Sequence, residues 1–266
     1  MFEQQYWELV KKILKVGEFR KVRNGLTKSV FGETLVADET AFHFPILTLR
    51  KMHINGILGE LAAMLRKPKH VDDFKKWGCN YWEKWADADG SLRLDYGNSW
   101  MNWNDQAIDQ MQRVIDKIKT DPTDRRLLVS GWNPSNLDSL SLPCCHILYQ
   151  WYVRDGKYLD MMWYQRSADL MIGTPSNMVF ASLWNSLIAN ETNLTPGKIV
   201  MNIGDVHIYS EHLEQAIELS KQNFICSPVR YNLNMPKGQK TVDFEPKQFE
   251  LGEYNFLKTA NFELKA

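Results

Sequence analysis

The chain has 266 residues and a formal net charge of zero at neutral pH. A chain without a basic surplus is not expected to have a nucleic-acid polymer as its main partner, because duplex binding usually needs a basic surface. With 44% hydrophobic and 24% charged residues, the composition is that of a globular protein. Its length suits one sizeable core, and no composition shift or repeat divides it, which predicts one α+β domain over residues 1–266.

The four cysteines, at positions 79, 144, 145 and 226, show neither a disulfide framework nor a metal-binding spacing. Adjacent Cys144 and Cys145 are badly placed to pair with each other, so a reducing cytoplasm is expected. The first nineteen residues carry acidic and basic side chains throughout, unlike a secretory signal. No apolar run approaches the length that crosses a bilayer, so no membrane partner is predicted.

The predicted elements begin with an amphipathic helix over residues 4–16, where apolar residues recur at helical spacing. Asn24-Gly25 marks a turn within residues 21–38, which are typical of a hairpin or of a loop and a strand. Residues 52–66 repeat apolar positions at helical spacing before Pro68, which predicts a buried helix. An aromatic, loop-rich stretch follows to residue 104.

The second half of the chain alternates strands and helices. A helix is predicted over 107–122, a strand over 125–132, and two long strands over 146–153 and 158–165 around an Asp-Gly turn. Residues 176–190 predict a helix with Ser176 as its N-cap. A strand over 197–209 and a helix over 210–222 follow, and the tail is mixed. Residues 164–177 form an unusually polar connector between an aromatic strand and an apolar helix.

The first candidate for chemistry is a cysteine beside a histidine in LPCCH, residues 142–146. Cys145 at this position can be an activated nucleophile, although Cys144 competes for the role and a buried apolar cysteine is the plainer interpretation. Glu60 lies on the flank of a strongly apolar helix. Burial there would raise its pKa and suit it to proton transfer through water, unless the side chain reaches bulk solvent.

Several further polar residues suit a nucleotide monophosphate. Arg125 and Arg126 open a predicted strand, where paired guanidinium groups can face one phosphate. Arg166 and Ser167 place a guanidinium beside a hydroxyl. Each of these can also be an ordinary solvated side chain.

Two motifs suit the base and the sugar. The amide of Asn177 offers a donor and an acceptor together, which matches the imide edge of uracil. His207 and Tyr209 alternate with apolar residues and therefore share one face of a strand. Polar residues at a core edge would show the same pattern.

Taken together, three segments resemble the thymidylate synthase and deoxypyrimidine hydroxymethylase superfamily. They are DRRLLVSGWNPSNLDSLSLPCCHILYQWYVRDGKY (124–158), YQRSADLMIGTPSN (164–177) and GDVHIYSEHLEQ (204–215). They are similar to the arginine pair, nucleophile, phosphate-asparagine and histidine-tyrosine motifs of that superfamily, and a looser similarity covers much of the remaining chain. The resemblance implies an α+β fold with a large mixed sheet packed with helices, and a homodimer formed through that sheet.

The resemblance implies covalent one-carbon chemistry on dUMP without a metal. Cys145 would add to carbon 6, and carbon 5 would then attack the one-carbon unit of the co-substrate 5,10-methylenetetrahydrofolate. Glu60 would manage proton transfers through water, Tyr96 would lie near the proton lost from carbon 5, and Asn177 would read the base. Asp169 is expected among the catalytic residues as well.

The resemblance also assigns the binding residues. The phosphate would be held by Arg166, Ser167 and a loop arginine near Arg23, with Arg125 and Arg126 donated by the other subunit. The sugar hydroxyl would be held by His207 and Tyr209. The folate would be bound by Arg50, Lys51, Trp82, Trp85, Asp169 and Gly173.

The chain departs from the synthases mainly on the folate side. After the helix glutamate, Ala62, Ala63 and Met64 stand where the synthases have an aromatic pair, and Leu94-Asp95 stands where they have Gly-Pro. Three single residues also differ: Cys144 replaces a proline, Ala168 replaces a cysteine and Ser176 replaces a phenylalanine. The C-terminal tail ANFELKA replaces an APVAV-like lid. In the synthases that lid excludes water. If water reaches the exocyclic methylene of the covalent nucleotide before hydride does, the product is a hydroxymethyl pyrimidine.

These departures favour a deoxyuridylate hydroxymethylase. The phage deoxycytidylate hydroxymethylases lack the lid and carry a VADE run similar to LVADET at 35–40, but they read cytosine with an aspartate where this chain has Asn177. The sequence therefore predicts 5-hydroxymethyl-dUMP as product, made by a phage-encoded enzyme in a host cytoplasm. Thymidylate synthase is the main alternative; a dCMP or CMP hydroxymethylase and a non-catalytic nucleotide-binding relative are weaker ones.

Overall fold

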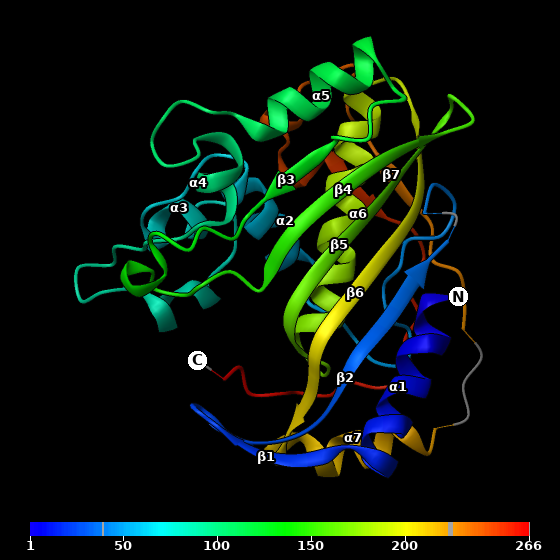
Figure 1. Cartoon of the computed structure of the whole chain (residues 1–266). Coiled ribbons are helices and arrows are strands. Elements are labelled where there is room, and N and C mark those ends of the chain that lie inside the picture. The colour runs from blue at the N-terminus through cyan, green and yellow to red at the C-terminus, as the bar shows by residue number, and fades with distance from the viewer. Residues whose placement is uncertain (39, 223–225, 266) are drawn as a thin grey trace.

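A six-stranded mixed sheet organises the protein (Figure 1), and the computed structural model describes residues 1–38, 40–222 and 226–265. The strand order is β1-β2-β6-β5-β4-β3. Neighbouring strands are antiparallel except β5 and β6, which run parallel because a helix crosses between them. The strands are β1 (Glu18–Val22), β2 (Gly25–Ala37), β3 (Leu128–Ser130), β4 (His146–Arg154), β5 (Tyr158–Asp169) and β6 (Thr195–Tyr209).

Helices and short turns surround this sheet. The α-helices are α1 (Phe2–Val16), α2 (Ile54–Met64), α3 (Val71–Lys75), α4 (Tyr96–Met101), α5 (Gln110–Thr120), α6 (Gly173–Glu191) and α7 (Leu213–Ser220). The 3-10 turns are η1 (Tyr81–Trp85), η2 (Leu137–Ser139), η3 (Ser210–His212), η4 (Thr241–Asp243) and η5 (Pro246–Gln248), and β7 (Tyr231–Leu233) pairs with β8 (Phe249–Leu251). The predicted α+β fold with a mixed sheet is confirmed.

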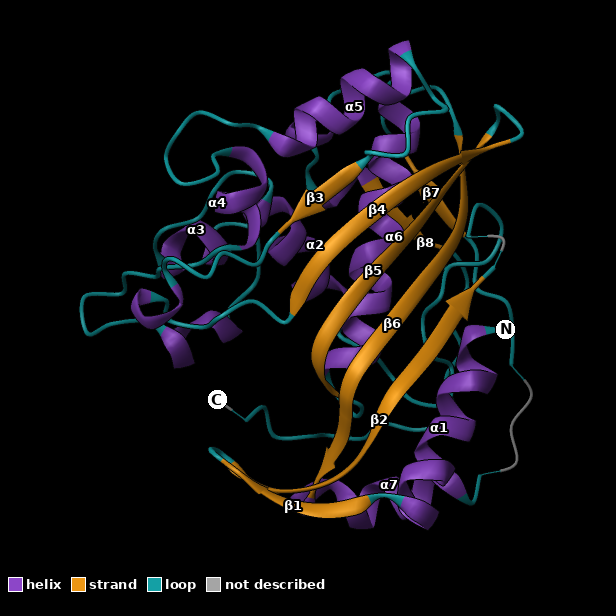
Figure 2. Ribbon diagram, in the orientation of Figure 1, coloured by secondary structure: helices purple, strands orange, loops and turns teal. Residues whose placement is uncertain are grey.

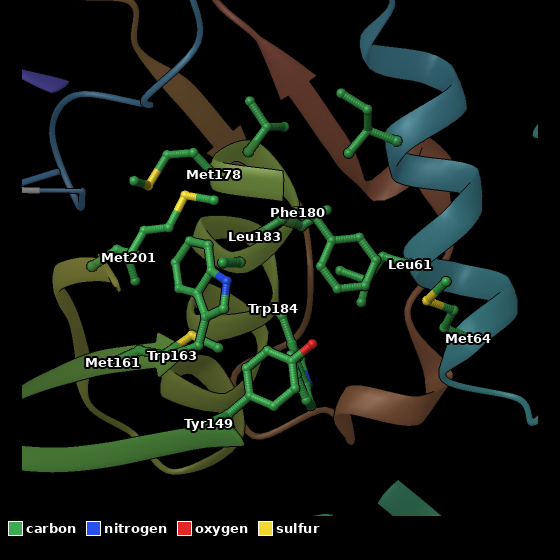
Figure 3. Close-up of a cluster of buried hydrophobic side chains, with 14 of the residues drawn as sticks. Leu61, Met64, Tyr149, Met161, Trp163, Met178, Phe180, Leu183, Trp184 and Met201 are labelled. Atoms are coloured by element: carbon green, nitrogen blue, oxygen red, sulfur yellow. The ribbon is translucent and has the colours of Figure 1, made fainter. Parts of the chain in front are cut away.

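The core lies between the sheet and α6. This helix is apolar on almost every side, so nearly all of its residues are buried. Trp184 is its centre: its ring stacks on Trp100 at 4.4 Å and meets Tyr149 of β4 edge-on at 4.8 Å. Figure 3 shows Leu61 and Met64 of α2 completing this cluster on the side away from the strands. The core therefore fixes α2 and α6 relative to the strand ends.

The opposite face of the sheet is largely uncovered. In Figure 2 the face of β4, β5 and β6 turned to the viewer carries no helix among the described residues. Exposed apolar side chains lie on the sheet strands, namely Phe31, Leu128, Leu148, Tyr152, Met162 and Tyr164. An apolar face of this kind is typical of an interaction surface.

Most predicted elements are confirmed, with shifted ends. The hairpin turns at Asn24-Gly25, where Gly25 has a positive φ of 143°. Ser176 as N-cap was wrong: α6 begins at Gly173 without a side-chain cap, and Ser176 lies inside the helix, where its Oγ donates to the Ile172 carbonyl at 2.8 Å. The polar connector is in fact the end of β5, a three-residue turn and the first turns of α6.

Candidate active site

A cavity of about 1030 Å³ opens where β5 and β6 end and β4 begins. Parallel β5 and β6 bring their carboxyl ends to one edge, and β4 starts at that edge because it is antiparallel to β5. This size is at the upper end for small-molecule sites. The predicted site residues that line it are Arg23, Arg50, Glu60, Trp82, Trp85, Tyr96, Cys145, Arg166, Ser167, Asp169, Gly173, Asn177, His207 and Tyr209.

The thiol of Cys145 faces this cavity. The backbone N–H of Cys145 donates to the hydroxyl of Tyr96 at 2.9 Å, and this hydrogen bond connects the segment just before β4 to α4. Burial raises the pKa of the Cys145 thiol, while the positive charge of Arg166 and a hydrogen bond from Tyr96 lower it. A nucleophilic thiolate at this position therefore depends on both groups.

Cys144 has a different environment. Its side chain is fully buried, and its Sγ donates to the carbonyl of Gly131 at 3.1 Å. Burial raises the pKa of this thiol to about 12, and Cys144 does not line the cavity. Of the two adjacent thiols, only that of Cys145 can reach a ligand in the cavity.

His146 does not supply a charge to Cys145. Burial lowers the pKa of its imidazole to about 4, so the ring is neutral near pH 7. Its Nδ1 lies 2.8 Å from the hydroxyl of Tyr149. The cation beside the nucleophile is Arg166, whose Nε and Nη2 donate to the carbonyls of Cys144 and Pro143, each at 2.8 Å.

Glu60 is an ionisable group of the same cavity. Burial raises the pKa of its carboxyl to about 7, although hydrogen bonds from Tyr81 and Trp82 oppose this shift. The indole Nε1 of Trp82 donates to Oε1 at 2.9 Å. The Tyr81 ring lies against Gly56, one helical turn before Glu60, where a Cβ would come within 3.2 Å of it. A carboxyl with this pKa can both accept and donate a proton near neutral pH.

The amide of Asn177 belongs to a chain of hydrogen bonds. Its Nδ2 donates to Gln165 Oε1 at 3.2 Å, and Trp163 Nε1 donates to the same oxygen at 3.2 Å. Gln165 Nε2 in turn donates to the Ser167 carbonyl at 3.0 Å. His146 donates to Asn177, since this hydrogen bond favours the protonated ring. The hydrogen bonds therefore fix which atoms of Asn177 and Gln165 donate and which accept.

The end of β6 and the β1–β2 turn form another part of the cavity wall. His207 and Tyr209 share one face, as predicted, with ring centroids 5.1 Å apart. Tyr209 accepts a hydrogen bond from Asn24 Nδ2 at 2.8 Å, which places the neighbouring Arg23 at the cavity. Asp205 Oδ1 lies 2.7 Å from His207 Nδ1 and fixes the orientation of that ring.

Arg125 and Arg126 lie outside the cavity of their own chain. Both precede β3 at the edge of the sheet, and both are exposed. Neither is among the lining residues. Within one chain they cannot contact a ligand in the cavity.

The residues expected to hold folate divide into two groups. Trp82, Trp85, Asp169 and Gly173 line the cavity between η1 and the start of α6. Arg50 also lines it, but its guanidinium is buried, donates to the Met171 carbonyl and lies 5.0 Å from the Phe262 ring. Lys51 is exposed beside the Phe256 ring and does not line the cavity.

The C-terminal segment from 252 to 265 contains no helix or strand and crosses near the ends of β5 and β6 (Figure 1). Lys84 Nζ donates to the Leu264 carbonyl at 2.8 Å, and His212 Nε2 lies 3.1 Å from the Glu263 carbonyl. Asn261, Phe262 and Lys265 contribute to the lining. Ala266 of the ANFELKA tail and Glu39 of the VADE run lie outside the described residues.

Several lining residues were missed by sequence reasoning. Tyr81, Gln165, Asp205 and His146 act through other side chains, so only the fold brings them to the site. The tail residues come from a segment whose pattern indicates no regular element. Gln165, His146 and Asp205 lie in the motifs 164–177, 142–146 and 204–215, so these three had a signal, whereas Tyr81 had none.

No group of three or more His, Cys, Asp or Glu side chains in the described part of the chain is arranged to hold a metal ion. No helix in the same part of the chain has the length and apolarity needed to cross a membrane.

The family follows from the whole chain. The model of a family described as thymidylate synthase matches residues 4–266. This family transfers a one-carbon unit from methylenetetrahydrofolate to dUMP, which agrees with a cavity that joins a thiol, a near-neutral carboxyl and a row of polar strand ends. The chain therefore belongs to the thymidylate synthase family and is a one-carbon transferase acting on dUMP.

Proposed function

We propose that this protein is a deoxyuridylate hydroxymethylase, which converts dUMP, methylenetetrahydrofolate and water into 5-hydroxymethyl-dUMP and tetrahydrofolate. One observation carries the choice of product: the cavity that holds Cys145 is also lined by Glu60, Tyr81 and Ser176. Hydroxyl and carboxyl groups can hold and deprotonate a water molecule, whereas an apolar wall would exclude it.

The nucleotide would bind along the strand ends. Arg166 has donors left beyond its two carbonyl bonds, and with Ser167 and Arg23 it would hold the phosphate. His207 and Tyr209 would bind the deoxyribose hydroxyl, since Asp205 and Asn24 already fix their orientations. This arrangement brings carbon 6 of the base toward Cys145.

The covalent step would follow from this placement. The Cys145 thiolate adds to carbon 6, and carbon 5 forms a bond to the one-carbon unit of the folate. Carbon 5 then loses its proton near Tyr96, and the bond from the one-carbon unit to the folate nitrogen breaks. These steps leave an exocyclic methylene on a nucleotide still bound to Cys145.

Water would complete the reaction beside Glu60. Glu60, with a pKa of about 7, accepts a proton from a water molecule while the oxygen of that water forms a bond to the methylene carbon. The electrons return to the ring, and the bond from carbon 6 to Cys145 breaks. No oxidation or reduction takes place, so tetrahydrofolate is released unchanged in oxidation state.

The chain of hydrogen bonds around Asn177 supports uracil over cytosine. Gln165 Oε1 accepts from Trp163 and Asn177, so Asn177 must turn its Nδ2 toward Gln165. The second Nδ2 hydrogen can then donate to a carbonyl at carbon 4, and Oδ1 can accept from the N3–H of uracil. Cytosine needs the flipped amide, which would place two acceptor oxygens against each other.

The uncovered face of the sheet supports a homodimer. Leu148 and Tyr164 lie on neighbouring strands and are exposed in the isolated chain, as is Tyr152. A second copy on this face would bury them, and Arg125 and Arg126 would reach the partner's phosphate site. A mixture of the Cys145→Ala and Arg126→Ala proteins would then regain activity, because one site in a mixed dimer is intact.

The proposed product is tested with oxygen-18-labelled water. We expect the nucleotide product to gain one labelled oxygen together with the one-carbon unit. A methyl product without labelled oxygen would contradict the proposal and leave the family assignment intact. The phage-type origin is proposed from the resemblance alone.

Thymidylate synthase is the second candidate, and the tail favours it. The segment from 252 to 265 is bonded to both sides of the cavity, by Lys84 and by His212, and Phe262 adds an apolar ring to the lining. A tail that excluded water would allow hydride transfer and give dTMP with dihydrofolate. Turnover of dCMP or CMP, or binding without turnover, would instead support the weaker alternatives.

A further inference from the structure

A buried carboxyl lies directly behind the nucleophile. Asp95 is the residue before Tyr96, and only 2% of its surface is exposed. Its Oδ1 accepts from Ser99 Oγ at 2.9 Å and from Asn136 Nδ2 at 2.7 Å. Its Oδ2 is buried without a hydrogen-bond partner, and so is Oδ1 of the same Asn136. Two facing polar side chains are thus joined by one bond, and each retains one orphaned acceptor.

A single proton would satisfy both orphaned oxygens. Two acceptors cannot bond each other, and a buried polar atom without a partner costs about 1–3 kcal/mol. A neutral carboxylic acid can donate from its O–H to an amide oxygen while its carbonyl accepts from the amide N–H. We propose that Asp95 is a neutral acid in the folded protein, forms this cyclic pair with Asn136, and positions Cys145.

The surroundings favour the neutral form. Burial raises the pKa of Asp95, and its hydrogen bonds from Asn136 and Ser99 oppose this only in part. The thiol of Cys144 interacts electrostatically with Asp95, but burial raises the pKa of this thiol to about 12, so it is neutral and offers no positive charge to a carboxylate. Within the described residues, no cationic side chain forms an ion pair with Asp95.

The two guanidinium groups bonded near Asp95 and Asn136 in the chain contact other groups. Arg93 donates to Asp87 at 2.7 Å and to the Ser139 carbonyl, and Arg166 donates to the carbonyls of Pro143 and Cys144. Nothing among these contacts compensates a negative charge on Asp95. A buried, unpaired carboxylate would be costly, so it binds a proton instead.

The pair is one of three contacts between the segment that contains Cys145 and the segment that contains Tyr96. Ser141 N donates to the Arg93 carbonyl at 2.9 Å, Asn136 meets Asp95, and Cys145 N donates to the Tyr96 hydroxyl at 2.9 Å. The segment that ends in Cys145 is thereby fixed to the segment that carries Tyr96. This inference rests on the proposed role of Cys145, because a positioning residue acts only through the group it holds.

Replacement by the matching amide tests the protonation state. Asp95→Asn keeps both bonds of the cyclic pair, so kcat/KM should stay within about threefold of the parent. Asp95→Ala removes both, and the misplaced Cys145 should lower kcat by on the order of 10²-fold with little change in dUMP affinity. Loss of activity in Asp95→Asn equal to that in Asp95→Ala would mean that the negative charge is needed, which would overturn the proposal.

A swapped pair separates pairing from a merely structural role. Asn136→Asp in the Asp95→Asn background again combines one acid and one amide, so activity should recover relative to Asn136→Ala. If activity does not recover although urea unfolding shows that both proteins are folded and both still bind dUMP, the cyclic pair would be contradicted.

Two readouts do not depend on the reaction at all. An infrared difference spectrum between the parent and Asp95→Asn should contain the band of a protonated carboxyl. Since the folded pKa is raised above the ordinary 3.8, the parent should lose stability relative to Asp95→Asn as the pH rises from that value toward the folded pKa. A carboxylate band, or a stability difference that is flat over this range, would overturn the inference even if the hydroxymethylase proposal holds.

Discussion

The nucleotide side and the folate side of the cavity are built in different ways. On the nucleotide side, neighbouring strand ends and the first turns of α6 supply a closed chain of hydrogen bonds through Gln165, Asn177 and His146. On the folate side, α2 and η1 meet a C-terminal segment whose last residues are held by hydrogen bonds from Lys84 and His212 and by the ion pair of Lys265 with Glu211. We therefore expect base choice to depend on residues in regular elements, and water access to depend on a segment without regular secondary structure.

The largest expected effect is loss of the nucleophile. Cys145→Ala should lower turnover by on the order of 10⁴-fold or more while dUMP affinity is kept, because the covalent step has no substitute. Cys144→Ala is the matched control: that buried thiol does not reach the cavity, so turnover should persist. Steady-state kinetics and dUMP titration measure both variants. Activity that survives in Cys145→Ala would assign the reaction to another group.

The next effect concerns the carboxyl on the folate side. Glu60→Gln should cost on the order of 10²–10⁴ in kcat, the usual range for an acid-base group. In the parent, a rate that needs ionised Glu60 should rise with pH through about 7. Tyr81→Phe removes a hydrogen bond that lowers the pKa of Glu60, so this limb should move to higher pH. A pH profile that is unchanged in Tyr81→Phe would show that Tyr81 does not influence the pKa of Glu60.

A smaller effect is expected when the nucleotide side is loosened. Gln165→Leu leaves Asn177 free to flip, and losing one fixed buried acceptor costs about 1–3 kcal/mol. The preference for dUMP over dCMP in kcat/KM should thus fall by about tenfold to 10²-fold. Asn177→Asp should change this preference more and favour dCMP, because a protonated Asp side chain can donate to N3 of cytosine and accept from its amino group. An unchanged ratio in Gln165→Leu would show that the base is read elsewhere.

The smallest effect concerns an exposed anchor of the tail. Lys265 lies 3.0 Å from Glu211, an ion pair near the surface. Such pairs contribute about 0–1 kcal/mol, so Lys265→Ala should change the KM for folate by no more than about fivefold. Lys247→Ala, which removes an exposed pair with Glu245 away from the cavity lining, is the control. A larger change in Lys265→Ala would make the tail a stronger lid than these contacts indicate.

Periodicity and turn residues predicted most elements. Asn24-Gly25 marked the hairpin, and the helix over 52–66 appeared as α2 because one face of it is apolar. The start of α6 was missed, since the helix begins at Gly173 without any side-chain cap. A helix start without a capping side chain has no simple local signal.

The site was predictable where a residue contacts the cavity directly. Cys145, Asn177 and His207 all line it as the motifs indicated. Residues that act through others, such as Gln165 and Tyr81, depend on contacts between distant segments that no spacing rule encodes. The choice between Cys144 and Cys145 likewise needed the burial of each thiol, because both residues lie in the irregular segment before β4, where no periodicity indicates which side chain is buried.

The most direct test of the proposed function is the dihydrofolate formed per molecule of dUMP converted. Absorbance would follow dihydrofolate, and a mass spectrum would identify the nucleotide. We expect 5-hydroxymethyl-dUMP with no dihydrofolate, because water reaches the methylene beside Glu60. A methyl product with one dihydrofolate for each nucleotide would contradict this account and mean that the C-terminal segment seals the cavity.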